Sequence, residues 1–366
     1  MSKPVAVDLF SGAGGLSEGF IQAGFFIAAS VELDRYAAET QKRNHTHHCR
    51  YRTEVICSDV RSVPAARLSY SCAETGSRRP HVLMGGPPCR GFSRSNRRTR
   101  NMDNPENHLF RDFLRLVREL TPLIVVIENV ADLVRFEKGA VADEIRAYLE
   151  EMGYQVQHEV LNAVRFGLPQ RRSRVFFVAV KSGMKFAFPE GSSDGEIPLW
   201  AAISDLPSLS NGHAVDEMPY GSPQPLSKYQ AKRRSGKPTV KNNLVSRNND
   251  LVIERYKHIP QGGNWEDIPE ELMQNYADRT MCHQWIYRRL PECEPSITIL
   301  NFRKNMLIHP REHRGLSVRE AARIQSFNDD YIFCGPLMHQ QQQVANAVPP
   351  LLARALARAV RHTLGI

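Results

Sequence analysis

The sequence lacks any long apolar run. In its 366 residues, no apolar stretch approaches the ~20 residues that a helix needs to cross a bilayer. The first residues, MSKPVAVDLF, also lack the apolar segment of a secretory signal and lead directly into a predicted strand. We therefore expect an intracellular protein with no membrane partner.

Paired cysteines and spaced metal ligands are lacking as well. The seven cysteines are an odd number at irregular spacing, which does not fit the disulfide framework of a small secreted domain. The segment HTHHC (45–49) gathers histidines and a cysteine, but no second ligand pair follows at the spacing of a zinc site. We expect neither a disulfide-stapled fold nor a bound metal.

Acidic residues are fewer than basic ones. The chain has 48 Lys and Arg against 39 Asp and Glu, a formal net charge of +9 and a pI near 9.3. Its 42% hydrophobic and 24% charged residues are typical of a globular protein. Charge alone therefore leaves two possibilities open, a nucleic-acid partner and an ordinary basic enzyme.

Strand-like and helix-like segments alternate through the first 180 residues. The predicted strands are nearly continuous apolar runs, and helical patterns such as LSEGFIQAG and RYAAETQKRN lie between them. The strands are expected at 5–10, 26–33, 54–59, 81–86, 123–130 and 174–180. This alternation predicts an α/β fold with a mostly parallel sheet, helices on both faces and ligands at the carboxyl ends of the strands.

The pattern changes near residue 183 and changes again near residue 314. Residues 183–313 are rich in Pro, Gly, Ser and Asn, and 228–257 hold nine Lys or Arg against two acids. Helical patterns return after 314 and end in an amphipathic segment that we expect to pack on the first domain. We predict a first domain over 1–182, a second, smaller domain over 183–313, and a return to the first over 314–366.

The motif DLFSGAGG (8–15) places a Gly-rich turn between a predicted strand and a helix, and acids end the next two strands at Glu32 and Asp59. An acid after the second strand can bind ribose hydroxyls, and one after the third can accept from an adenine amino group. The turn has no basic residue to bind a pyrophosphate, and it departs from the G-x-G-x-x-G motif of dinucleotide enzymes. S-adenosylmethionine therefore fits this site better than NAD. A tight structural turn is the alternative reading of the glycines alone.

The motif GGPPCRGFS (85–93) places Cys89 where a strand ends and an arginine-rich stretch begins, a setting that favours a reactive thiolate. Glu128 ends a neighbouring predicted strand and would share its rim. A thiolate and a carboxylic acid together suit addition to an electron-poor ring. The alternative for Cys89 is a buried thiol that only packs. The alternatives for Glu128 are a helix cap and an ion-pair partner. Arg172 and Arg174 alternate as a strand begins, so we expect them to share one target unless both are simply solvated.

Taken together, these motifs resemble the cytosine-5 DNA methyltransferases, in that family's order and over nearly the whole chain except the middle. The match continues with VELD (31–34), SDV (58–60), ENV (128–130) and QRRSR (170–174). It ends with RGLSVREAARIQSF (314–327) and QVANAVPP (343–350). Three positions depart from the family pattern: Ala345, the PSIT of 295–298, and Asn328.

The resemblance implies the S-adenosylmethionine-dependent, Rossmann-like methyltransferase fold with a target-recognition domain in the middle. By it, Cys89 is the nucleophile, Glu128 faces a ring nitrogen, and Arg172 and Arg174 belong to the catalytic set. The implied cofactor contacts are Phe10, Gly12, Leu16, Glu32, Leu33, Asp59, Val60, Gly86, Asn346 and Val348. The implied DNA contacts are Ser93, Arg94, Arg97 and Arg98 in the arginine-rich segment, with Arg233 and Arg234 expected from the basic middle stretch.

The resemblance also implies a reaction. The thiolate adds to carbon 6 of a cytosine that has been flipped out of the duplex, carbon 5 accepts a methyl group and loses its proton, and the thiol leaves. We expect double-stranded DNA as partner, a monomer on DNA, a cognate restriction endonuclease for the same site, and a cytoplasmic, nucleoid-associated location in a bacterium. The alternatives are a tRNA cytosine-5 methyltransferase, a DNA-binding paralogue without activity, and a cysteine hydrolase.

Overall fold

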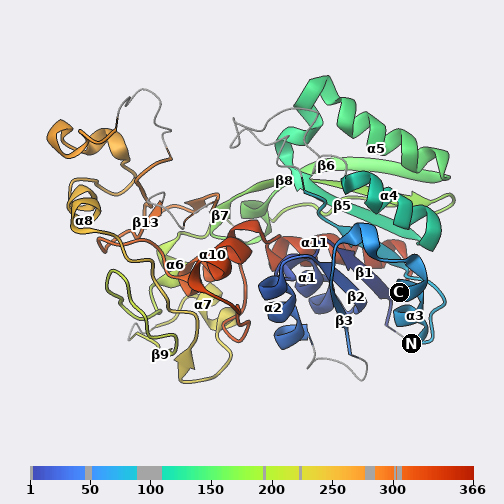
Figure 1. Ribbon diagram of the computed structural model, residues 1–366, viewed down its shortest axis with the longest axis horizontal. Helices are drawn as coiled ribbons and strands as arrows, with labels where there is room; N and C mark the ends of the chain where they lie inside the picture. Colours follow the sequence, from blue (N-terminus) through green and yellow to red (C-terminus); the bar gives the residue numbers. More distant parts are fainter. Residues whose placement is uncertain are drawn as a thin grey trace. The chain divides into compact units, whose positions relative to one another are not determined.

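The computed structural model describes residues 3–45, 52–88, 109–192, 195–221, 225–276, 285–300, 302 and 307–366. The chain divides into two compact units, each made of segments distant in sequence (Figure 1). Unit 1 comprises Met1–Phe166, Ser173–Gly191 and Val348–Ile366, and unit 2 comprises Gly167–Arg172 and Ser192–Ala347. The chain therefore returns to unit 1 at 348 rather than at the predicted 314, and helical segments after 314 belong to unit 2.

Unit 1 is built on a seven-stranded sheet with the order β3-β2-β1-β4-β5-β8-β6. All pairs are parallel except those of β8, which is antiparallel to β5 and to β6. The strands are β1 (Val5–Leu9), β2 (Phe26–Glu32), β3 (Glu54–Cys57), β4 (Val82–Gly85), β5 (Ile124–Val130), β6 (Tyr154–Asn162) and β8 (Ser173–Lys181). The predicted mostly parallel α/β sheet is confirmed.

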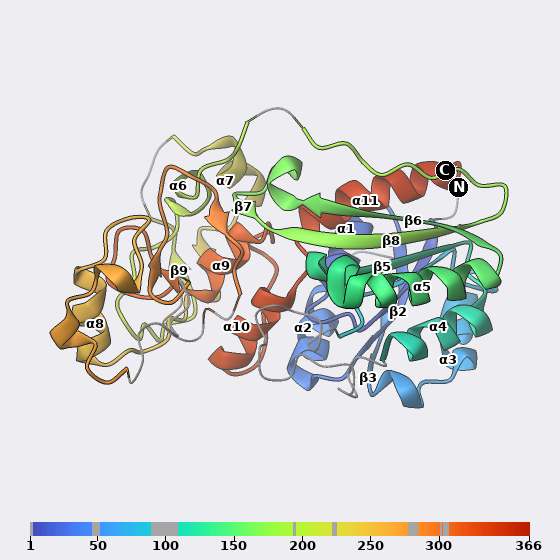
Figure 2. The ribbon, with the colours of Figure 1, turned by 90° about the horizontal axis from the view of Figure 1, so that it is seen from above.

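Helices cover both faces of this sheet. Figure 2 shows α1 and α11 on one face and α3, α4 and α5 on the other. The helices of unit 1 are α1 (Gly15–Gln22), α2 (Arg35–His45), α3 (Ala65–Ala73), α4 (Leu109–Leu120), α5 (Ala140–Glu151) and α11 (Pro350–Thr363), with 3-10 turns η1 (Val60–Ser62), η3 (Ala131–Gly139) and η4 (Ala163–Phe166). Alternate residues of the strands pack with apolar residues of α3, α4 and α5 in one core cluster.

The central strands form because their residues are apolar on both faces. Every residue of β1 and β4 is buried, as expected for strands covered by helices on both sides. The strand β6 differs, because only Tyr154, Val156 and Leu161 of its nine residues are buried. It lies at the sheet edge with a polar sequence, YQVQHEVLN, and the sequence pattern did not predict it.

The helices α1 and α11 pack closely because α1 carries Gly19 at their contact. A Cβ at Gly19 would lie 2.3 Å from the Cβ of Ala353 and 2.6 Å from the backbone nitrogen of Arg354. At the other end of α1, the Arg361 guanidinium donates to the carbonyl of Ala23 at 2.9 Å. A cation there satisfies a terminal carbonyl and complements the helix dipole.

Unit 2 consists of short elements and irregular segments. Its helices are α6 (Trp200–Ile203), α7 (Lys228–Arg233), α8 (Asp250–Lys257), α9 (Val318–Ile324) and α10 (Leu337–Asn346), with 3-10 turns η5 (Trp265–Asp267) and η6 (Glu270–Leu272). Its strands are β7 (Gln170–Arg171), β9 (Met218–Pro219), β10 (Thr239–Val240), β11 (Arg288–Arg289), β12 (Ser296–Ile297) and β13 (Leu307–Ile308), which pair in twos.

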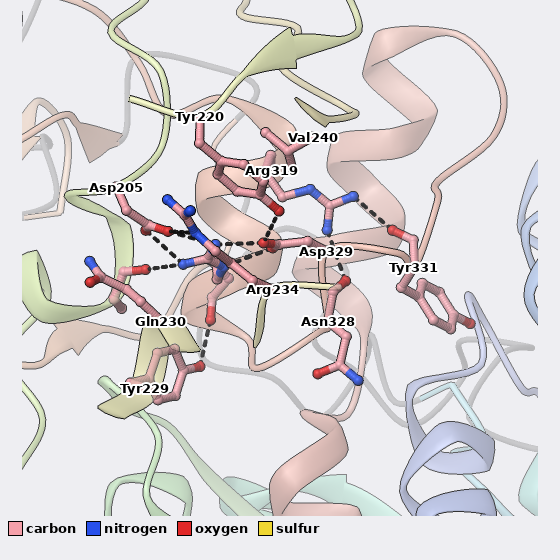
Figure 3. Close-up of polar contacts among 12 residues, drawn as sticks. Asp205, Tyr220, Tyr229, Gln230, Arg234, Val240, Arg319, Asn328, Asp329 and Tyr331 are labelled. Carbon is pink, nitrogen blue, oxygen red and sulfur yellow. Dashed lines mark hydrogen bonds and ion pairs between the residues drawn. The ribbon is translucent and has the colours of Figure 1, made fainter. Parts of the chain in front are cut away.

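Buried ion pairs hold unit 2 together where extended sheets do not (Figure 3). Arg323 of α9 has no exposed side-chain surface and pairs with Asp205 at 2.9 Å and with Asp329 at 2.6 Å. Arg234 also pairs with Asp205, and the Tyr220 hydroxyl donates to Asp329 at 2.6 Å. Two of these contacts, Arg323–Asp205 and Tyr220–Asp329, join segments that are more than 100 residues apart in the sequence.

No helix in the described part of the chain is both long enough and apolar enough to cross a membrane.

Candidate active site

The turn between β1 and α1 has a backbone that few side chains tolerate. Gly12 and Gly14 have φ of 54° and 84°, in the left-handed region that glycine adopts without strain. Phe10 has φ of 55°, which is unusual for a bulky residue and marks a functional or over-determined position. The Gly14 N–H donates to the Ser11 carbonyl at 2.9 Å, and α1 starts from this turn.

Glu32, at the end of β2, supports the turn from the neighbouring strand. Its Oε2 accepts from the Gly12 N–H at 2.7 Å, and its Oε1 accepts from the Asp34 N–H at 2.8 Å. Burial raises the pKa of Glu32, while these two backbone donors oppose the rise. Two further predicted cofactor residues differ in exposure. Leu16 is buried, whereas Leu33 is 68% exposed.

Asp59 follows the end of β3 and caps η1, accepting from the Arg61 N–H at 2.9 Å. Its carboxylate pairs with the Arg61 guanidinium at 2.6 Å, and this hydrogen bonding lowers the pKa of Asp59. Val60 behind it is buried. Since the pair is solvent-exposed, it contributes little to stability, and the Asp59 carboxylate stays accessible at the carboxyl rim of the sheet.

Glu128 and Arg174 form the central ion pair of unit 1. The Arg174 Nε lies 3.0 Å from the Glu128 Oε1, and both side chains are almost buried, with 13% and 12% of their surface exposed. β4 and β5 are paired so that Gly85 is opposite Ile127, which places Gly86 beside Glu128. A Cβ at Gly86 would lie 2.9 Å from the Glu128 Oε2. The missing side chain at Gly86 thus leaves space for the Glu128 carboxylate.

The loop after β4 is anchored beside this pair. The Asn129 amide donates to the carbonyl of Pro87 at 3.2 Å, and Asn129 is buried. The predicted nucleophile follows two residues later in the sequence. Cys89 and the predicted DNA contacts Ser93, Arg94, Arg97 and Arg98 lie outside the described residues.

The expectation that Arg172 and Arg174 share one target is wrong. Arg172 is fully buried in unit 2, where it donates to the carbonyls of Ile299, Ala345 and Ala347 at 3.1–3.2 Å. The alternation argument fails because the two arginines do not belong to one strand: β7 pairs with β12 in unit 2, and β8 starts at residue 173 in unit 1. Arg172 therefore fixes backbone, and its predicted place in the catalytic set is not supported by its contacts.

The other two predicted cofactor residues flank the boundary between the units. Asn346 is the last residue of α10, and its Oδ1 accepts from Gln342 at 2.6 Å. Val348 is buried and begins the last segment of unit 1. Ala345, one of the departures from the family pattern, is a buried helical residue whose carbonyl accepts from Arg172.

The structure gives Arg233 and Arg234 partners within the protein, which argues against the predicted phosphate contacts. Arg233 is 6% exposed and donates to the Ser326 carbonyl at 2.9 Å. Arg234 pairs with the fully buried Asp205 at 2.7 Å and lies over the ring of Tyr220. The sequence shows the charges but not the acids and carbonyls that the fold brings to them. The cations of this stretch that are exposed are Lys228, Lys232, Lys237, Arg247 and Lys257, and Lys257 pairs with Glu254 at 2.7 Å.

Three residues behind the Gly-rich turn were not predicted as part of the site: Asp8, Ser17 and Gln41. The Gln41 amide donates to the Gly12 carbonyl at 2.7 Å and to the Ser11 hydroxyl at 2.8 Å. Asp8 is buried in β1, and its Oδ2 accepts from the Ser17 hydroxyl at 2.6 Å. The signal for Asp8 was its position, since an acid inside an apolar strand needs a reason.

Comparisons with known proteins agree on one family. The family model for C-5 cytosine-specific DNA methylases matches residues 5–362. The type II methyltransferase M1.HphI of Haemophilus parahaemolyticus is 35% identical over 355 residues, covering 97% of this chain and 86% of that protein. The type II methyltransferase M.DdeI of Desulfomicrobium norvegicum is 33% identical over 377 residues, covering 97% and 88%.

Solved structures show the same fold. A crystal structure described as a "DNA modification methyltransferase encoded within prophage" from E. coli matches with a TM-score of 0.78 at 23% identity, over 100% of both chains. This likeness and the family match confirm the resemblance drawn from the motifs. The chain is a DNA (cytosine-5-)-methyltransferase and belongs to the C-5 cytosine-specific DNA methylase family.

Proposed function

We propose that this enzyme transfers a methyl group from S-adenosylmethionine to carbon 5 of a cytosine, flipped out of a specific duplex sequence, through a covalent adduct with Cys89. The observation that carries this proposal is the Glu128–Arg174 pair at the carboxyl end of β5. It lies beside the end of β4, whose loop, anchored by Asn129, leads to Cys89.

The residues at the carboxyl rim fit the proposed cofactor. Glu32 is fixed for ribose hydroxyls by its two backbone donors, and Asp59 remains accessible for an adenine amino group. Leu33, exposed between them in sequence, offers an apolar surface to a purine. The cofactor would supply an electrophilic methyl group at a positively charged sulfur.

The chain's own groups then divide the work on the base. The Cys89 thiolate adds to carbon 6, so that a carbon–sulfur bond forms and electron density moves into the ring toward carbon 5. Glu128, as a carboxylic acid, donates a hydrogen bond or a proton to the ring nitrogen and so stabilises the negative charge that develops there. Arg174 orients the Glu128 side chain and contacts the base. After methylation, carbon 5 loses its proton to a base or water, and the carbon–sulfur bond breaks to release the thiolate.

Unit 2 is proposed as the target-recognition part. Candidates for phosphate contacts, which position a protein on DNA without reading its sequence, include the exposed residues Lys228, Lys232, Lys237 and Arg247. The relatives at 35% and 33% identity are type II methyltransferases, which favours DNA over the tRNA alternative. On the same grounds we propose a cytoplasmic, nucleoid-associated enzyme that acts as a monomer on DNA and protects sites from a cognate endonuclease.

The test combines bisulfite sequencing with adduct trapping. DNA from cells expressing the chain is expected to carry 5-methylcytosine at one recurring sequence. Purified enzyme is expected to form a denaturant-stable adduct on duplex DNA containing 5-fluorocytosine, because fluorine cannot leave as a proton does. Cys89→Ala is expected to lose both activities while binding the cofactor, because the sulfur serves only the addition step.

Cys293→Ala provides the matched control, since Cys293 is an exposed thiol of unit 2. It is expected to keep full turnover and adduct formation. Turnover by Cys89→Ala comparable with the native enzyme would overturn the assignment of the nucleophile.

A further inference from the structure

A buried carboxyl group, that of Asp8, lies behind the Gly-rich turn, and no cationic partner is found for it among the described residues. Asp8 is 1% exposed, and its Oδ2 accepts from the Ser17 hydroxyl at 2.6 Å. Within the described ranges, its Oδ1 has no hydrogen-bond partner. Leaving an acid in this state is unfavourable for the free protein, so a functional reason for it is worth seeking.

The strand register places Asp8 beneath the proposed cofactor site. Asp8 pairs with Ser30 of β2 and with Met84 of β4. Two residues further along these strands are Glu32 and Gly86, and Glu128 lies beside Gly86. Residues two apart in a strand point to the same face, about 7 Å apart. Glu32, Gly86 and Glu128 form a row across the ends of these neighbouring strands. Asp8 therefore lies about 7 Å below the middle of this row, with Glu32 and Glu128 at its two ends.

Among the residues that the structure describes, this row and Asp8 contribute three carboxyl groups and one cation, Arg174. Arg174 pairs with Glu128, but no ion pair to Lys or Arg is found for Asp8 or Glu32 among the described residues. Burial raises the pKa of Asp8 to about 7, the Ser17 hydroxyl opposes this, and the charges of Glu32 and Glu128 add to the rise. The strand β4 contributes no titratable group here. The helix α1 contributes the Ser17 hydroxyl, which does not titrate, and the Glu18 carboxyl group, whose Oε2 lies 3.8 Å from the His45 Nε2.

We propose that Asp8 is a charge-selecting residue of the cofactor site, whose buried carboxylate favours the positively charged sulfur of the methyl donor over the neutral sulfur of the product. This inference rests on the proposed function. Ribose at Glu32 and the target base near Glu128 would place the reacting sulfur between them, above Asp8. Methyl transfer removes the positive charge, so the same carboxylate ceases to hold the product and favours its release.

A linked proton follows from this arrangement. The donor binds better when Asp8 is ionised, so binding lowers the pKa of Asp8 and releases a proton at pH values near 7. The donor-to-product affinity ratio should therefore rise with pH through about 7, since ionised Asp8 is the state that attracts the cation. A residue that only supports the fold would change both affinities together.

The experiment compares S-adenosylmethionine and S-adenosylhomocysteine by calorimetric titration of the full chain. Asp8→Asn keeps the shape and an oxygen for the Ser17 hydroxyl but removes the charge. We expect donor affinity to fall about tenfold, which corresponds to lowering the pKa of Asp8 by about one when the donor binds, with product affinity unchanged. Glu144→Gln is the matched control: Glu144 is an acid of α5, on the other face of the sheet from α1, and pairs with the exposed Arg111 at 2.9 Å. Removing its charge should leave the affinity ratio as in the native chain.

The pH dependence is a second measurement that needs no stable variant. The native ratio is expected to rise between pH 6 and 8, and titrations at pH 7 in two buffers of different ionisation enthalpy should show proton release with the donor. The amino groups of both ligands titrate nearby, so the difference between them is the quantity compared. A flat native ratio, or equal losses of both affinities in Asp8→Asn, would overturn the inference. If the native chain binds neither ligand, the proposed function itself fails.

Discussion

At the scale of single residues, the catalytic rim depends on side chains that are absent as much as on those present. Gly86 leaves room for the Glu128 carboxylate, and Arg174 fixes that carboxylate from the next strand. The resemblance assigned Gly86 to the cofactor, but its neighbour in the structure is Glu128. We infer that Gly86 positions Glu128, the acid that we propose to face the base.

Gly86→Ala tests this inference. The new methyl group would press on the Glu128 Oε2 from 2.9 Å and displace it. A displacement of this kind at a reacting centre lowers rates by about 100-fold, so we expect kcat to fall by one to two orders of magnitude. The KM for S-adenosylmethionine and the unfolding temperature should change little. A raised KM for the cofactor with an unchanged kcat would instead show that Gly86 acts through the cofactor.

At the scale of elements, two helices show how local sequence and long-range packing combine. In α1, Gly19 is a poor helix former by propensity, yet α11 approaches the helix at this position. In α9, Ser317 and Glu320 form a capping box that the sequence pattern S-x-x-E predicts. The presence of Gly19 is explained only by the packing of α11 against α1. The capping box of Ser317 and Glu320 is explained by the sequence of α9 itself.

Gly19→Ala should destabilise the protein, although the same change in an isolated helix stabilises it by about 0.5–1 kcal/mol. The added methyl overlaps Ala353 and the backbone of Arg354, and overpacking of this kind costs about 1–3 kcal/mol. Denaturant unfolding measures the change. Adding Ala353→Gly should restore only part of the loss, because backbone atoms remain within 2.7 Å. An increase in stability would show that α11 shifts to accommodate the added methyl group without a loss of packing.

Glu320 should make stability depend on acid pH. It is buried, and burial would raise its pKa, but the Arg314 guanidinium at 2.7 Å outweighs this and lowers the pKa to about 2. A depressed acid pKa stabilises the fold above the unfolded value near 4.5, and this contribution disappears as pH falls toward 2.

Glu320→Gln retains a capping side chain but loses the charge. We expect it to cost about 3 kcal/mol at pH 7, because the pKa of Glu320 is lowered from 4.5 to about 2 and each tenfold change in proton affinity is worth about 1.4 kcal/mol. The cost should be much less at pH 3. Urea unfolding at both pH values measures this. An equal loss at pH 7 and pH 3 would mean that shape rather than charge explains the role of Glu320.

At the scale of the whole molecule, the units are not contiguous in sequence. Unit 2 includes α9 and α10, and the ion pairs of Arg323 join α9 to Asp205 and to Asp329. A boundary at 313 would separate Arg323 from Asp205. Removing one partner from a buried pair costs about 3–5 kcal/mol, because a charge is left unpaired.

Exchanges of unit 2 with that of a relative should therefore depend on where the chain is cut. Replacement of 192–347 keeps the buried pairs together and should give a folded enzyme that methylates the relative's target sequence. Replacement of 183–313 should give a less stable protein, measured by its unfolding temperature. Bisulfite sequencing identifies the target. An active 192–347 exchange that keeps the original target would show that recognition lies outside unit 2.

The sequence alone determined the family, the mostly parallel α/β sheet, and the acids at the ends of its strands. These follow from local signals: apolar runs that are buried on both faces, glycines at turns, and motifs such as DLFSGAGG and ENV. The edge strand β6 was missed because its residues are mostly polar. Periodicity reports burial, and an edge strand buries few residues.

Only the tertiary structure decided what the charged residues do. Arg172, Arg174, Arg233 and Arg234 look alike in the sequence, yet one pairs with Glu128, one pairs with Asp205, and two donate to backbone carbonyls. The boundary of unit 2 also cannot be seen in the sequence, nor can the lack of a cationic partner for Asp8 among the described residues, because both depend on how distant segments pack. An ionic partner is set by position in space rather than by separation along the chain, so local sequence rules cannot predict it.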